Sequence, residues 1–358
     1  GPRPEATLPV YCTPSRPASH GFVTRPRILI REDLERGWTM VRAGRKLTRR
    51  QLLQAAGAAG VWSLVGSLPA ASAQTACPQA TNGAGFYRFR LGAFTVAVLA
   101  DGTATVPRVL PTWGANPDRQ EEFRRTLESY YLPVTDGVNS YHPVFVDTGR
   151  HKVLLDTGLG NLGPASTGKL VQHLRNAGVS PDDVDTVFIT HCHPDHIGGL
   201  NPQGRPAFPR ARLVIGEVEF HYWTSLTQPP PAVQQNILPL RDRFVRIRAG
   251  QEIVPGLVAV ESFGHTPGHL SVLVQSGGES VFVFGDAAGH FVLSLRHLGS
   301  YLTFDMNGPQ AAAVRRRLFA QLADQGTLVT AYHFPFPATG RIRRVEDHFE
   351  FVPVVWTW

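Results

Sequence analysis

The chain has 358 residues, of which 42% are hydrophobic and 18% are charged. It is long enough for one large domain or two ordinary ones, and apolar enough to bury a full core, which excludes a globally disordered chain. With three cysteines and no glycine period, it is neither a disulfide-framework protein nor a collagen-like one.

The formal net charge of +7 is unevenly distributed along the chain. Residues 1–73 hold 11 Lys and Arg against 4 Asp and Glu, which leaves 24 basic and 24 acidic residues in the other 285. Nucleic acids and anionic membranes are bound through a basic excess. Since the body of the chain has no such excess, we expect no nucleic-acid partner and a small, neutral substrate.

The basic segment has the pattern of an export signal. Five cations between Arg42 and Arg50 precede the apolar run 52–68, and residues 71–73 (Ala-Ser-Ala) offer a small-residue cleavage site. The sequence Thr-Arg-Arg-Gln-Leu-Leu at 48–53 resembles a twin-arginine signal. The apolar run is too short and too rich in glycine to be a stable membrane span.

We therefore divide the chain into three parts. Residues 1–39 are an upstream extension or an added leader, residues 40–73 are a twin-arginine-type signal peptide that begins at Met40, and residues 74–358 are a single catalytic domain. This division predicts a periplasmic or secreted protein. It leaves Cys77 and Cys192 in the mature chain, and the sequence alone does not pair them.

Beyond residue 80 the sequence predicts short strands and helices in alternation. Gly92 and Gly149 mark the turns of two hairpins. The hairpin strands are 86–90 with 94–99 and 144–146 with 153–155; helices are predicted at 118–130, 168–177 and 308–323, and further strands at 184–190, 211–215, 257–261, 270–275, 280–285 and 327–331. The proline-rich segment 229–239 is predicted to be a stiff loop. This order favours a layered α/β fold with mixed sheets.

A cluster of histidines follows the apolar strand 184–190. The segment reads Thr190-His-Cys-His-Pro-Asp-His-Ile-Gly-Gly199, so that three imidazoles and one carboxylate emerge where the strand ends. His191 and His193, two residues apart, point the same way if the chain is extended, and Pro194 then turns the chain. Neutral imidazole and carboxylate are the ligands expected for zinc and similar divalent ions, so the segment predicts a metal site. Cys192 is interpreted as a small buried side chain that points away from the histidines.

This segment resembles the His-x-His-x-Asp-His signature of the metallo-β-lactamase superfamily, and further landmarks of that family follow in order. They are the Asp-Thr-Gly turn at 156–158, the Gly-His-Thr-Pro-Gly-His stretch at 264–269, the Gly-Asp pair at 285–286 and Tyr332-His333 after the strand 327–331. The resemblance implies an αββα sandwich of two mixed sheets with helices on the outer faces. It also implies a homodimer.

The resemblance further implies two divalent metal ions, most simply Zn²⁺, that share a hydroxide able to attack an ester-like substrate. One ion would be held by His191, His193 and His269, and the other by Asp195, His196 and His333, with Asp286 bridging the two. Asp195 and Asp286 are the predicted catalytic residues, and Asp156 is predicted to orient a ligand imidazole. His265, His290 and His297 are interpreted as structural histidines.

Within the superfamily, the methyl parathion hydrolase group is the most similar. The similarity lies in residues 86–94, in Ala100-Asp-Gly-Thr103 and in the C-terminal segment 341–354, and Trp223 stands where that group places a pocket tryptophan. The resemblance predicts hydrolysis of a neutral phosphotriester, aryl ester or lactone. One alternative is an N-acyl-homoserine lactonase, although the Tyr that such enzymes usually carry soon after the bridging Asp is replaced by Ala-Ala-Gly at 287–289. Another is an iron persulfide dioxygenase, which shares the same ligand residues.

Overall fold

The computed structural model describes residues 41–42, 45–46 and 85–355. The chain divides between Gln74 and Thr75 into two units, which we treat separately. In the first unit, the described residues form a two-stranded antiparallel ladder of β1 (Val41–Arg42) and β2 (Arg45–Lys46). The rest of the predicted export signal, together with Cys77, lies outside the described residues.

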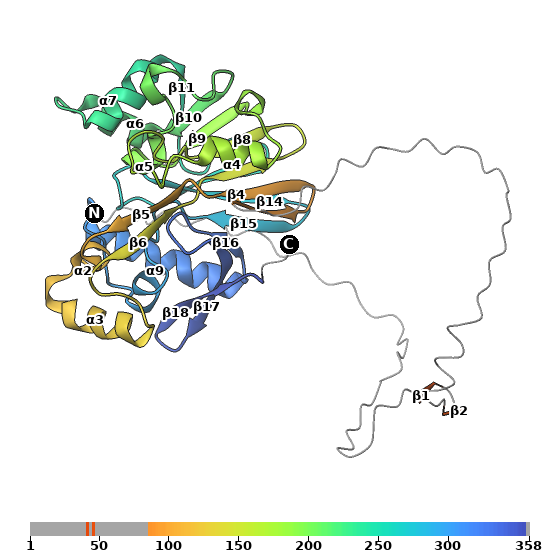
Figure 1. Ribbon diagram of the computed structural model, residues 1–358, viewed down its shortest axis with the longest axis vertical. Helices are drawn as coiled ribbons and strands as arrows, with labels where there is room; N and C mark the ends of the chain where they lie inside the picture. The colour runs from red at the N-terminus through yellow and green to blue at the C-terminus, as the bar shows by residue number, and fades with distance from the viewer. Residues whose placement is uncertain (1–40, 43–44, 47–84, 356–358) are drawn as a thin grey trace, which may run out of the picture. The chain divides into compact units, whose positions relative to one another are not determined.

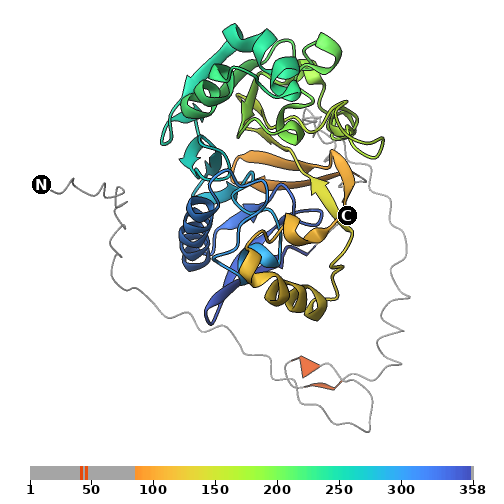
Figure 2. The same ribbon diagram turned by 90° about the vertical axis from the view of Figure 1, so that its left-hand side faces the viewer.

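The second unit contains two seven-stranded sheets (Figures 1 and 2). The first sheet has the order β11-β10-β9-β8-β7-β4-β3. Its strands are β3 (Phe86–Leu91), β4 (Phe94–Leu99), β7 (Val144–Asp147), β8 (Lys152–Leu155), β9 (Thr186–Ile189), β10 (Arg212–Gly216) and β11 (Phe244–Ile247). Strands β8 to β11 run parallel, whereas β3, β4, β7 and β8 are joined antiparallel, so the sheet is mixed.

The second sheet has the strands in chain order, β12 to β18. They are β12 (Glu252–Val254), β13 (Leu257–Glu261), β14 (Leu270–Ser276), β15 (Glu279–Val283), β16 (Leu328–Thr330), β17 (Thr339–Val345) and β18 (His348–Pro353). All neighbours are antiparallel except β15 and β16, which run parallel. A parallel pair needs a long crossover, and helix α9 (Gly308–Gln325) lies in it.

The two sheets pack face to face, and alternate residues of one strand belong to different cores. On β9, Phe188 packs between the sheets, whereas Val187 and Ile189 face the helices on the outer side of the first sheet. On β15, Val281 lies between the sheets, whereas Phe282 faces the core under α9. Because strand side chains alternate between faces, a strand buried on both faces reads as a continuous apolar run.

Helices cover both outer faces, which completes the predicted αββα sandwich (Figure 1). Helices α4 (Leu170–Asn176), α6 (Glu217–Ser225) and α7 (Pro231–Asn236) pack on the first sheet, and α9 packs on the second. Shorter helices are α2 (Val109–Thr112), α3 (Gln120–Ser129), α5 (Pro194–Ile197) and α8 (Leu293–Arg296), and a separate ladder joins β5 (Gly102–Val106) to β6 (Gly137–Tyr141). No helix among the described residues combines the length and apolar character that crossing a bilayer requires.

The structure confirms the predicted hairpins, helices and strands to within a few residues, and it corrects one prediction. The segment 229–239 is not a loop throughout, because α7 begins at Pro231 and a 3₁₀ helix follows at Leu238–Arg243. Proline fits the first turn of a helix, where its missing N–H costs nothing. Val233 and Ile237, both fully buried, then anchor the segment in the core.

Replacing Phe188 tests the packing between the sheets. The Phe188→Ala variant removes a fully buried ring and should lower the free energy of unfolding by about 3–5 kcal/mol. Val245→Ala, on the exposed side of β11, should change it by less than about 1 kcal/mol. Urea denaturation in the presence of a chelator measures both without a metal contribution. Equal losses in the two variants would contradict this assignment of the core.

Candidate metal centre

The candidate site lies at one edge of the sandwich, where strands of both sheets end. His191 follows β9, Asp286 follows β15 and His333 follows β16, while His265 lies in the loop between β13 and β14. The parallel pairing of β8 with β9 and of β15 with β16 brings these strand ends to a common edge. Loops far apart in the sequence therefore present their polar side chains to one another.

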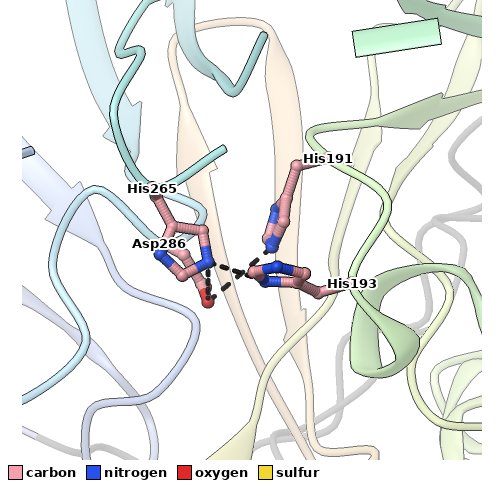
Figure 3. Close-up of side chains that lie close together, drawn as sticks. All are labelled: His191, His193, His265 and Asp286. Carbon is pink, nitrogen blue, oxygen red and sulfur yellow. Dashed lines mark hydrogen bonds and ion pairs between the residues drawn. The ribbon is translucent and has the colours of Figure 1, made fainter. Parts of the chain in front are cut away.

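The first group contains His191, His193, His265 and Asp286, whose donor atoms all lie within 4.8 Å of one another (Figure 3). His193 Nδ1 is 2.9 Å from His265 Nε2. Asp286 Oδ2 is 3.2 Å from His265 Nε2 and 3.9 Å from His191 Nε2. Three ring nitrogens and one carboxylate oxygen thus point to a common centre.

The second group contains Asp195, His196, Asp286 and His333, again within 4.8 Å. His196 Nε2 is 3.2 Å from Asp286 Oδ1 and 3.6 Å from Asp195 Oδ2. His333 Nε2 is 3.1 Å from Asp286 Oδ2 and 3.4 Å from Asp195 Oδ2. Asp286 belongs to both groups and contributes both of its oxygens.

Three atoms of these groups show that the residues fit metal ions. His191 Nε2, His196 Nε2 and Asp286 Oδ1 are buried and have no hydrogen-bond partner among the described residues. Buried polar atoms are nearly always paired, and leaving one unpaired costs about 1–3 kcal/mol. All three face the centres of the two groups, where a cation would pair with them. Imidazole and carboxylate are suitable ligands for Zn²⁺ and related divalent ions.

The electrostatics of His191, His193 and Asp286 agree with cation binding. Burial lowers the pKa of His191 and of His193 well below the usual value, which keeps both imidazoles neutral and free to act as ligands. Burial alone would raise the pKa of Asp286, but His333, His196 and His265 hold it well below the usual range. The bridging carboxylate is therefore ionised.

The structure corrects the assignment of the two histidines in the stretch 264–269. His269, expected as a ligand, belongs to neither group. Its Nε2 accepts a hydrogen bond of 2.9 Å from the backbone N–H of Asp286, and its Nδ1 bonds Ser262 Oγ at 2.7 Å. His265, interpreted from the sequence as structural, belongs to the first group instead. His269 lies just before β14 and is held in the strand end, whereas His265 lies farther out in the loop.

Asp156 holds the second group in place. It accepts hydrogen bonds of 2.8 Å from His196 Nδ1, from the backbone N–H of Thr190 and from Thr190 Oγ1. A carboxylate can only accept here, so His196 carries its proton on Nδ1 and turns Nε2 toward the group. The ring of Tyr332 stacks on His196 with a centroid distance of 3.9 Å, and its hydroxyl donates to the backbone oxygen of Asp195 at 2.6 Å.

Glu219 is a buried anchor that the sequence analysis missed. Its carboxylate accepts four hydrogen bonds. The donors are the backbone N–H groups of Cys192 and Gly268, the hydroxyl of Thr266 and the indole N–H of Trp223. It thereby ties the loop of His191 and His193 to the loop of His265. An acidic residue one helical turn before Trp223, on the buried face of α6, is the signal that would have revealed it.

Of the other predicted residues, Trp223 and Cys192 lie next to the first group or beneath its loop, whereas His290 and His297 lie outside both groups. Trp223 is 7% exposed and its ring centroid lies 5.9 Å from that of His193, so it adjoins the first group. Cys192 is buried in the core beneath the loop, as predicted. His290 and His297 belong to neither group: His290 Nδ1 accepts backbone N–H bonds, and His297 contacts helix α3.

The comparisons with known proteins agree with this geometry. Residues 136–326 match the profile of the Metallo-beta-lactamase superfamily. An N-acyl homoserine lactonase of Bacillus sp is 28% identical over 157 residues, which are 41% of this chain and 57% of that protein. Metallo-beta-lactamase domain-containing protein 1 of Mus musculus is 36% identical over 120 residues, 33% of this chain and 37% of that protein. The matched segment therefore spans about half the length of these relatives or less.

Two solved structures resemble about three quarters of the chain. The dizinc quorum-quenching lactonase AidC, in complex with N-hexnoyl-L-homoserine, has a TM-score of 0.69 at 24% identity and covers 76% of this chain and 98% of its own. The hydrolase AbOPH of the beta lactamase superfamily has a TM-score of 0.71 at 25% identity and covers 77% of this chain and 100% of its own. Both likenesses support the sandwich fold.

Two glutamates of α6 provide a matched test of the anchor. In the Glu219→Gln variant, an amide that is itself a donor faces four donors, so we expect a loss of about 1–3 kcal/mol in unfolding free energy and weaker metal retention. Glu217→Gln removes only an exposed ion pair with Arg248 and should leave the unfolding midpoint unchanged. Thermal unfolding and metal analysis measure both effects. Identical midpoints for the two variants would rule out Glu219 as an anchor.

Proposed function

The chain belongs to the metallo-beta-lactamase superfamily, and we propose that it is a metal-dependent hydrolase of small neutral cyclic esters, with N-acyl homoserine lactones as the first candidates. The observation that carries the proposal is the pair of His and Asp groups that share Asp286 and contain three buried, unpartnered donor atoms. This arrangement fits two divalent cations that share one carboxylate as a ligand.

We propose that the first cation is held by His191, His193 and His265, the second by Asp195, His196 and His333, and both by Asp286. Divalent cations in such a site activate water for attack at neutral pH and polarise the carbonyl or phosphoryl oxygen of a substrate. In each group, the donor atoms of these residues all lie within 4.8 Å of one another.

The two carboxylates of the site differ in their access to solvent. The side chain of Asp286 is 5% exposed and that of Asp195 is 18% exposed. Asp286 therefore orients the two groups from inside, whereas Asp195, whose Oδ2 faces the second group, would use its other carboxylate oxygen to accept a proton from the attacking water and pass it to the departing alkoxide. A proton relay at Asp195 would allow an ester with a poor leaving group, such as a lactone, to be opened.

The substrate class rests on two observations. The curated relatives include N-acyl homoserine lactonases, and the chain beyond residue 73 is formally neutral, which suits an uncharged substrate. No tyrosine lies among the three residues directly after Asp286, but the ring of Tyr141 lies edge-on to that of His333 at 5.6 Å and places a phenol beside the second group. Phosphotriesters are the second candidate, supported by the motifs similar to methyl parathion hydrolase.

Substrate preference is the direct test. On metal-loaded protein we expect kcat/KM for an N-acyl homoserine lactone to exceed that for an aryl phosphotriester at least tenfold, about 1.4 kcal/mol of transition-state stabilisation. The reverse order would establish the phosphotriester candidate. If the protein bound a single iron per chain and consumed oxygen with a persulfide substrate, it would be a persulfide dioxygenase rather than a hydrolase.

The histidine pair of the 264–269 stretch tests which residue binds metal. His265→Ala should lower the metal content from two ions per chain toward one and reduce kcat/KM by roughly 100-fold or more, since even residues that only support a ligand are worth about 10–100-fold. His269→Ala should keep both ions after metal loading but lose about 1–3 kcal/mol of stability, because the Asp286 N–H is left unpaired. Loss of a metal ion in His269→Ala but not in His265→Ala would instead identify His269 as the ligand.

A further inference from the structure

Asp305, in the loop between α8 and α9, is a buried carboxylate in contact with the first group. Its Oδ1 lies 2.8 Å from His265 Nδ1, and its Oδ2 accepts the backbone N–H of Leu302 at 2.8 Å. Its side chain has no solvent exposure. Because a carboxylate in this position accepts, His265 carries a proton on Nδ1, and its Nε2 is turned toward Asp286 and His193 (Figure 3).

Arg315 of α9 holds this carboxylate from the other side. It is fully buried, and its Nη2 lies 3.4 Å from Asp305 Oδ2. Its Nε donates to the backbone oxygen of Ala287 at 2.8 Å and its Nη1 to that of Ser300 at 2.6 Å. Ala287 directly follows the bridging Asp286. One guanidinium therefore fixes both the support of His265 and the chain segment that carries the shared carboxylate.

We propose that Asp305 and Arg315 are positioning residues for the first metal ion. Asp305 sets the tautomer and the ring orientation of His265, and Arg315 fixes Asp305 and the residue after Asp286 in one rigid arrangement. The inference rests on the proposed function, because it assumes that both groups hold a cation. The second group has a matching device, since Asp156 orients His196 through the same kind of hydrogen bond.

The contact pattern distinguishes this role from simple packing. Burying an ion pair contributes little to stability compared with apolar residues of similar volume, so Asp305 and Arg315 are poor choices for filling a core. One oxygen of Asp305 is committed to His265 rather than to Arg315. The pair thus sits between α9 and the site and connects them.

Matched Asp→Asn variants test the proposal on the full chain. In Asp305→Asn the amide no longer fixes the His265 tautomer, so we expect one of two Zn²⁺ ions to bind about 10- to 100-fold more weakly in competition with a chelator. In Asp156→Asn the other ion should be the one that is bound more weakly. Asp324→Asn, which removes an exposed ion pair on the same helix α9, should leave both ions and the activity unchanged.

Cobalt substitution identifies the ion that is lost. The first group has three imidazoles and one carboxylate and the second has two of each, so the visible spectra of the two singly loaded forms should differ. Asp305→Asn should retain the spectrum of the second group, and Asp156→Asn that of the first. Arg315→Lys, which keeps the charge but loses the planar fork of donors, should weaken the same ion as Asp305→Asn to a smaller extent.

Several results would overturn the inference. One is that Asp305→Asn binds both ions with wild-type affinity, and another is that it binds both ions equally more weakly. A third is that Asp305→Asn and Arg315→Lys lower the unfolding midpoint without selective loss of one ion. If Asp305→Asn does not fold, Arg315→Lys decides by the same criterion. Absence of bound metal in the wild-type chain under metal-replete conditions would instead refute the proposed function.

Discussion

The buried carboxylate of Asp286 is the group on which the arrangement of the site depends. Ring nitrogens of His265, His196 and His333 lie 3.1–3.2 Å from its oxygens, and that of His191 lies 3.9 Å away. Removing a carboxylate from water is costly unless charges or donors surround it. Four imidazoles from three separate connections converge on it because each connection must contribute to offsetting that cost, whether directly or through a bound cation.

The loops hold their positions because each is tied to a neighbour by a buried polar contact. Glu219 joins the loop after β9 to the loop before β14. His269 fixes the backbone of Asp286, and Asp156 fixes His196. All three groups are fully buried or nearly so, and the hydrogen bonds they make have no competing water. In such surroundings a satisfied network selects one geometry, since any other would leave several donors unpaired. The strands of the sandwich hold the ends of these loops in place, so the buried polar contacts form between loops whose ends are fixed.

Much of this architecture could be predicted from the sequence, because strands buried on two faces leave a plain signal. The run Val187-Phe188-Ile189 and the histidine segment after it located both a central strand and the site. The prediction was wrong where local sequence does not determine orientation. His265 and His269 are four residues apart in one loop, and only the register of β14 decides which ring turns inward. Pro231 was interpreted as a loop residue because its helix forms through the burial of Val233 and Ile237, a tertiary effect.

Glu219 and Asp305 escaped prediction for a related reason. Each is an acidic residue distant in sequence from its partners, and an acidic residue is ordinarily exposed. Their burial follows from the donors that surround them, which only the fold brings together. The same fact makes the two metal groups unequal. Asp305 is balanced by Arg315, whereas no arginine or lysine of the described residues pairs with Asp156, and the second group also contains Asp195. The second group therefore carries the greater negative charge. A cation bound there would be held more strongly by charge alone, and a cation in the first group would depend more on the exact placement of its imidazoles.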